Sequence, residues 1–159
     1  MKNIIGAATL AFLTLIAPAN AMAHSFTVAL VIDGANPYSA QIKADFVRAA
    51  QERDGHADET ADGHLGGLDV YILYATNAGE LAALLSQQAI DISVLFDTAE
   101  LNNGVQKLTV ENNAVFIHAE AKDQENQGYI TAQRIDMAIR SLGEVNDKVA
   151  LANALTPRN

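Results

Sequence analysis

The most continuous hydrophobic segment after the first 25 residues is 26–32, which is apolar at every position but one. Because polar and apolar side chains do not alternate, both faces of this predicted strand should be covered, as in the centre of a parallel sheet. A turn follows at residues 33–37, and apolar residues then recur at helical spacing over residues 38–53. Asn36 can accept a free helix N–H group, and Pro37 suits the first helical position. The pattern predicts a buried strand leading into a helix.

Three more segments have strand composition, at residues 68–75, 92–97 and 114–120. Between them, one predicted helix covers residues 79–88, and another carries Leu101, Val105 and Leu108 at helical spacing. Helices of this length between short strands favour right-handed parallel crossovers. The sequence therefore predicts an α/β fold, a three-layer α/β/α sandwich with a small, mainly parallel four-stranded sheet.

The segments outside this pattern are expected to be loops or helices. Residues 51–67 are rich in glycine and acidic residues without an apolar period, which predicts a long hydrated loop or loose hairpin. After a polar link at residues 121–127, residues 129–142 form a helical stripe that Gly143 closes. Asn146 is expected to cap a last helix over residues 149–155. On the longer helix, the polar side chains Arg134, Asp136 and Arg140 are expected on the solvated side.

The beginning of the chain has the pattern of a secretory signal. Lys2 precedes an apolar run over residues 4–16, and the small-residue pattern Ala21-Met22-Ala23 follows. The run has about 13 residues, whereas a membrane-spanning helix needs roughly 20. We therefore expect a signal peptide at residues 1–23, a single domain at residues 24–159, a periplasmic or secreted location, and no membrane span after cleavage.

Composition narrows the possible partners and chemistry. The chain has no cysteine, so no disulfide or thiol chemistry is available. Its formal net charge of −9 becomes one unit more negative when Lys2 is removed, which argues against nucleic acid as a partner. No G-x-S-x-G elbow is present, and Gly63, Gly66 and Gly67 precede a strand, whereas a phosphate-binding loop follows one. We expect no catalytic site, no cofactor and a protein that is not an enzyme.

At this point the order of segments resembles a known family. The strand at residues 28–32, the helix at 38–53, the strand at 68–75, the helix at 79–88 and the strand at 90–96 are similar to the N-terminal lobe of type I periplasmic binding proteins. The similarity is greatest to the leucine/branched-chain amino-acid-binding type that serves ABC importers. The two late helical segments, residues 128–143 and 146–155, resemble a helix pair late in that family.

The resemblance implies a one-lobed relative of ABC-importer substrate-binding proteins, because the polar link at residues 121–127 stands where the second lobe would be. It implies transport of a small polar ligand such as an amino acid or a carboxylate, with an ABC permease or a second subunit as partner. In the family, hydroxyl residues after the third and fourth strands hold the ligand's carboxylate and amine. Here Thr98 alone keeps a hydroxyl group in those loops.

The expected ligand site lies at the carboxyl ends of the strands, where open α/β sheets bind ligands. That edge should collect polar side chains from four loops: Asp33, Asn36, Thr76, Asp97, Thr98, His118 and Glu120. Two alternatives remain open. In the first, the protein is an accessory or structural periplasmic protein that kept the fold without the ligand. In the second, it binds copper through the amine and imidazole of a processed N-terminal His24. A loop with His56 and His64 lacks the fixed spacing of a metal motif, so no other metal site is expected.

Overall fold

A computed structural model describes residues 25–53, 61–96, 99–119 and 126–156. The described residues form an α/β fold whose sheet contains five strands. The strands are β1 (Ser25–Ile32), β2 (His64–Leu65), β3 (Leu68–Ala75), β4 (Ile92–Phe96) and β5 (Val115–Ala119). The helices are α1 (Ser39–Gln51), α2 (Ala78–Gln87), α3 (Ala99–Glu111), α4 (Gln127–Leu142) and α5 (Lys148–Leu155).

The sheet has the strand order β2-β3-β1-β4-β5. The four strands that the sequence predicts are all parallel, with Val28 level with Ile72 on β3 and with Ile92 on β4. The prediction of four strands is nevertheless wrong, because β2 pairs with β3 in the antiparallel direction and makes the sheet mixed. The chain passes from β1 to one neighbour and then crosses to the other side, so the strand order reverses between β1 and β4.

The additional strand exists because a glycine turn follows it. Gly66 has φ +69°, and a Cβ atom there would lie 2.3 Å from the side chain of Ile139 on α4. Only glycine fits this turn, which brings His64 opposite Asp69 and Leu65 opposite Leu68. The buried Leu65 side chain then joins the core. The segment predicted as a long loop or loose hairpin therefore ends in a short hairpin.

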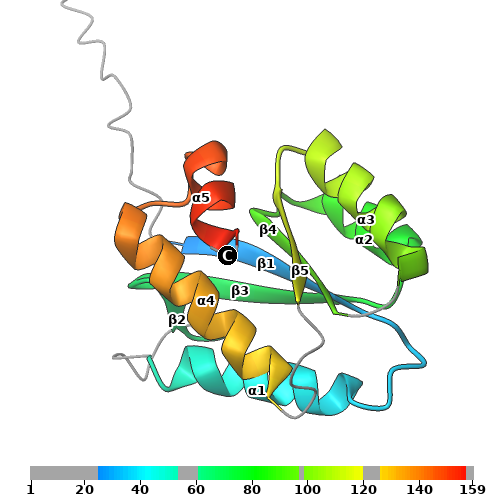
Figure 1. The fold of residues 1–159 in the computed structure, drawn as a ribbon, viewed down its shortest axis with the longest axis horizontal. Coiled ribbons are helices and arrows are strands. Elements are labelled where there is room, and N and C mark those ends of the chain that lie inside the picture. Colours follow the sequence, from blue (N-terminus) through cyan, green and yellow to red (C-terminus); the bar gives the residue numbers. More distant parts are fainter. Residues whose placement is uncertain (1–24, 54–60, 97–98, 120–125, 157–159) are drawn as a thin grey trace, which may run out of the picture.

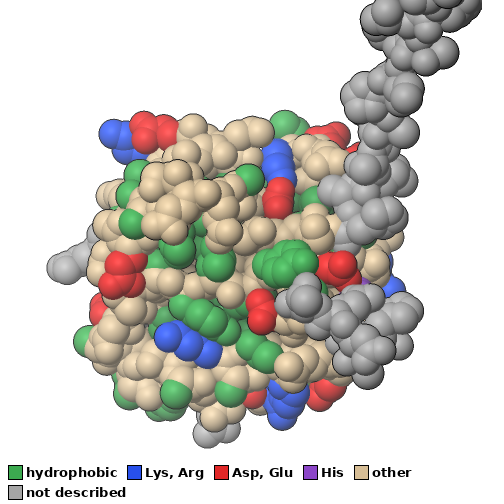
Figure 2. Space-filling view, turned by 180° about the vertical axis from the view of Figure 1, so that it is seen from behind, with side chains coloured by type: hydrophobic (Ala, Val, Ile, Leu, Met, Phe, Trp, Pro, Cys, Tyr) green, Lys and Arg blue, Asp and Glu red, His purple; other side chains and the backbone are tan. Residues whose placement is uncertain are grey.

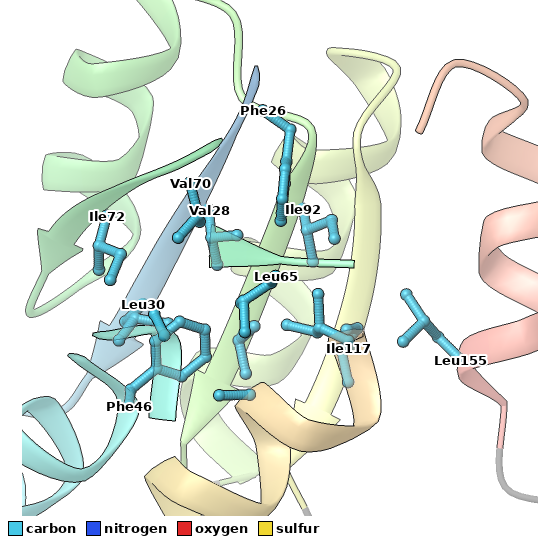
Figure 3. Close-up of a cluster of buried hydrophobic side chains, with 14 of the residues drawn as sticks. Phe26, Val28, Leu30, Phe46, Leu65, Val70, Ile72, Ile92, Ile117 and Leu155 are labelled. Carbon is cyan, nitrogen blue, oxygen red and sulfur yellow. The ribbon is translucent and has the colours of Figure 1, made fainter. Parts of the chain in front are cut away.

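Helices cover both faces of the sheet (Figure 1). One core cluster joins α1, α4 and α5 to the sheet, and the other joins α2 and α3 to the opposite face. In Figure 3, Phe46 of α1 lies against Leu30 of β1, while Leu155 of α5 lies near Ile117 of β5. The face opposite to that of Figure 1 carries small groups of hydrophobic side chains among charged ones (Figure 2). The sheet thus lies between two helical layers.

Two helix ends agree with the sequence prediction, but the predicted start of α1 at Asn36 and Pro37 is wrong, because Tyr38 is the N-cap residue and the helix begins at Ser39. Asn77 caps α2 by accepting the N–H of Glu80 at 3.0 Å, and Gly143 ends α4 with φ +76°. The predicted cap of α5 is wrong by one residue, since Asp147, one position after Asn146, accepts the N–H of Ala150 at 2.9 Å. A carboxylate at this position also interacts favourably with the helix dipole.

The prediction that Asp136 lies on a solvated helix side is wrong. Asp136 is 6% exposed, and its carboxylate accepts the Gly66 N–H at 2.8 Å and the Arg140 Nε at 3.0 Å. The Arg53 Nε lies 3.4 Å from the same carboxylate. Asp136 therefore joins the β2–β3 turn to α4 and to Arg53, two residues beyond the end of α1. The spacing of polar residues along a helix does not show that a distant turn supplies one of them with a hydrogen-bond partner.

The fully buried Ser93 of β4 gives a first testable prediction. Among the described residues, its hydroxyl has no hydrogen-bond partner, although the side chain is 0% exposed. A buried polar group without a partner costs about 1–3 kcal/mol. We expect Ser93→Ala to leave the free energy of unfolding unchanged or to raise it by about 1 kcal/mol, as measured by urea unfolding.

Thr109 provides the matched control for that substitution. It is also 0% exposed, but its hydroxyl donates to the Val105 carbonyl at 2.7 Å. Thr109→Val removes a satisfied hydrogen bond, so it should lower the free energy of unfolding. A loss of more than about 1 kcal/mol from Ser93→Ala would show that the Ser93 hydroxyl is stabilising.

Candidate functional site

The loop after β1 lies at the carboxyl edge of the sheet, next to the reversal in strand order. Asp33 accepts the Ala35 N–H at 2.8 Å, and Asn36 accepts the Tyr38 N–H at 2.8 Å. These are local turns in which a short polar side chain bonds its own backbone two residues later. Asp33 and Asn36 therefore stabilise the conformation of the loop that leads into α1.

Thr76, in the loop after β3, lies beside this turn. A Cβ atom added to Gly34 would lie 3.9 Å from the Cβ of Thr76. The Thr76 N–H donates to Glu80 Oε2 at 2.7 Å, and this backbone hydrogen bond is the main reason that the pKa of Glu80 lies below its usual value. The structure therefore brings Thr76 together with the loop of Asp33 and Asn36.

His118 lies apart from these residues. It is exposed on the edge strand β5, level with Leu95 of β4, which is itself level with Val31 of β1. Two strand spacings, roughly 10 Å, therefore separate His118 from β1. The other predicted site residues, Asp97, Thr98 and Glu120, lie outside the described residues.

An open hollow of about 640 Å³ lies where α1 and α4 begin, and its lining residues are Pro37, Tyr38, Ala40, Gln41 and Asn126. None of them is among the residues proposed from the sequence. Tyr38 fitted the apolar stripe of the predicted helix, yet it is 40% exposed. Asn126 belongs to the polar segment before α4. Its place beside α1 follows from the packing of α4 on α1, which sequence spacing does not show.

The electrostatics of the hollow favour negative charge. Tyr38 and Asn126 occupy the N-cap positions of α1 and α4, and neither makes a side-chain capping hydrogen bond. Neither helix has an acidic residue in its first turn. In α1, the backbone N–H groups of Ala40 and Gln41 have no partner among the described residues. Free N–H groups and the positive end of the helix dipole both attract anions.

The described histidines do not form a metal centre. His64 Nε2 lies 2.7 Å from Asp69 Oδ1, so this pair joins the two strands of the hairpin. Within the described ranges, no group of three or more His, Cys, Asp or Glu residues could hold a metal ion. His24 and His56 lie outside those ranges, so the copper hypothesis stays a prediction.

Comparisons with protein-family models, with curated proteins and with solved structures find no match to this chain. The resemblance to type I periplasmic binding proteins therefore stays a prediction from the sequence pattern. Among the described helices, none is long and apolar enough to cross a membrane.

Proposed function

We propose that the protein is an exported, one-lobed solute-binding module that holds a small anionic molecule, such as an amino acid or another carboxylate. The observation that carries this proposal is the hollow at the carboxyl edge of the sheet, which the uncapped N-terminal ends of α1 and α4 border. The free N–H groups of Ala40 and Gln41 suit a carboxylate, and Tyr38 offers an aromatic surface and a hydroxyl group.

The polar loops beside the hollow extend this site. Asp33 keeps one carboxylate oxygen beyond its bond to Ala35, which suits the amine of an amino acid. A single lobe cannot close over its ligand, so binding should be weak compared with a two-lobed protein. An ABC permease or a second subunit would then complete the site. This function places the protein in the periplasm or outside the cell, and it involves no catalysis.

A thermal-shift screen of the purified protein tests the proposal. A ligand that binds only the folded state adds about 2.7 kcal/mol of stability at a hundredfold excess over its dissociation constant. We expect a saturable rise in the unfolding temperature with amino acids or small carboxylates, and none with neutral sugars. If no compound shifts a folded protein, the accessory role is correct instead. If copper alone shifts it, the site is the His24 amine and imidazole.

A pair of charge substitutions tests the position of the site. Ala40 and Ala44 are both exposed on α1, but only Ala40 lines the hollow. Ala40→Glu should weaken carboxylate binding at least tenfold, about 1.4 kcal/mol, because it places a negative charge at the anion site. Calorimetry of the ligand found in the screen measures this change.

Ala44→Glu is the matched control and should leave the dissociation constant unchanged. Glutamate near a helix N-terminus does not destabilise the helix, so neither variant should unfold below the wild-type temperature. Equal weakening by the two variants would place the site elsewhere, because only a general effect of added charge would then explain the result.

A further inference from the structure

The edge strand β5 presents unpaired backbone groups. Its single neighbour in the sheet is β4. The Val115 N–H donates toward β4, to the Asp91 carbonyl at 2.8 Å. Because backbone groups alternate along a strand, the N–H and C=O groups of Phe116 and His118 point away from the sheet. Among the described residues, they have no hydrogen-bond partner.

The sequence of strand β5 lacks the residues that usually protect an edge. Natural edge strands carry lysine, other charges or proline, or a loop or helix covers them. The sequence of β5 is Val-Phe-Ile-His-Ala, without proline, lysine or an acidic residue. An open edge of this composition is a template for another strand.

A hollow of about 300 Å³ runs beside this edge, lined by Phe116, Ile117, His118, Arg134, Ala152, Leu155 and Thr156. Among the described residues, no carboxylate belongs to the lining, although the chain has a formal net charge of −9. Two copies of this acidic protein could therefore approach each other here without bringing carboxylates of the lining together.

Helix α5 adds an apolar stripe beside the edge. It packs with β5 in the same core cluster, on the face that α1 and α4 also cover (Figure 1). Ala152 and Thr156 line the hollow, and Val149 lies on the same side of α5 because it precedes Ala152 by three residues. Val149 is 73% exposed. The open strand edge and the exposed helix stripe thus lie side by side.

We infer that β5 is a homodimer interface, at which a second copy of the chain adds its own β5 in the antiparallel direction. The outward residues Phe116 and His118 stand symmetrically on either side of Ile117. A two-fold axis beside Ile117 therefore places Phe116 opposite His118 of the second copy, and His118 opposite its Phe116. Each such pair exchanges two backbone hydrogen bonds.

The same symmetry explains the α5 stripe. With the two-fold axis perpendicular to the sheet, the α5 helices of the two copies lie on the same face and approach each other across the axis. The exposed side chain of Val149 then becomes covered. A different protein could also pair with an open edge, but the absence of carboxylates among the described lining residues favours a second copy of this acidic chain.

Sedimentation equilibrium of the purified protein tests the dimer. The wild-type mass should rise from monomer to dimer with concentration. His118→Pro removes an outward N–H group without touching the bonds to β4, and it should weaken dimerisation at least tenfold. His118→Ala keeps that N–H group and is the control, so it should weaken the dimer far less. Circular dichroism checks that each variant is folded.

Substitutions on the helices test the second part of the interface. Val149→Glu should also weaken the dimer at least tenfold, because it places two negative charges near the axis. Met137→Glu on α4 is the matched control, since Met137 is 64% exposed and lies outside the α5 stripe. A folded wild-type protein that stays monomeric at millimolar concentration would contradict the proposal.

Cysteine cross-linking tests the register, since the chain contains no cysteine of its own. In the proposed pairing, the Cα atoms of Phe116 and the opposite His118 lie about 5.5 Å apart, within disulfide range. The Phe116→Cys/His118→Cys double variant should therefore form a covalent dimer on mild oxidation. His118→Cys alone should not, because its two copies would be roughly 8 Å apart. Efficient cross-linking of the single variant, or a dimer that survives His118→Pro, would overturn the assigned pairing.

Discussion

Replacing Gly128 with alanine is expected to lower the free energy of unfolding by about 2–3 kcal/mol. Gly128 lies in the first turn of α4, where it packs against α1. A Cβ atom at this position would lie 2.1 Å from the Ile42 carbonyl oxygen and 3.0 Å from the Phe46 backbone nitrogen. Both neighbours are helical backbone, so the two helices must move apart. Urea unfolding of the variant measures the loss.

Gly104→Ala is the matched control, because Gly104 is also helical. A Cβ atom there would lie 3.4 Å from the Cβ of Ala78, an ordinary contact. Alanine is a better helix former than glycine by about 1 kcal/mol, so this variant should be as stable as the wild type or more stable. Equal losses from both substitutions would show that the close packing of α4 on α1 is not the cause.

Replacing Asp136 with alanine is expected to cost about 3 kcal/mol at pH 7. The substitution leaves the Gly66 N–H without its acceptor, and it leaves the Arg53 and Arg140 guanidinium groups without their shared carboxylate. Asp136→Asn keeps an oxygen for Gly66 but removes the charge, so it should cost less. Urea unfolding of both variants separates the charge from the hydrogen bond.

The effect of Asp136 should depend on pH. Burial raises the pKa of its carboxyl group, but hydrogen bonds from Arg140 and the Gly66 N–H, and the charges of Arg140 and Arg53, outweigh burial and lower it below 3.8. The unfolded chain therefore binds the proton more readily, and the stabilisation is present above the unfolded pKa. It is lost as the pH falls through the folded pKa. The difference between wild type and Asp136→Asn should be full at pH 7 and should shrink as the pH falls below 3.8.

The sequence predicts the parallel strands well because long apolar segments report burial directly. Residues 68–75 were predicted as a strand and are β3, and the predicted helix over residues 129–142 is α4 with two more residues at its start. The sequence does not predict the short strand β2, because two residues are too few to show a period of hydrophobic and polar positions. Its position depends on Gly66, whose hydrogen-bond partner Asp136 lies 70 residues later in the chain.

The sequence indicates which edge of the sheet carries the candidate site, but it does not indicate which residues line the hollow. Strand order alone brings Asp33, Asn36 and Thr76 to one edge. The hollow needs Asn126 beside α1, and that proximity depends on the packing of α4 against Ile42. Sequence spacing gives no sign of such a contact. Tyr38 fitted an apolar helix face, so its 40% exposure could not be foreseen.

The position of α4 in the sequence has a consequence for folding during synthesis. Helix α1 ends at Gln51, whereas α4, which covers the same face of the sheet, begins at Gln127. The apolar side of α1 therefore stays uncovered until α4, more than 70 residues later in the chain, has left the ribosome. A protein with this order of elements cannot complete this side of its core until α4 has been synthesised, so α1 and the strands made before it must wait for their last packing partner.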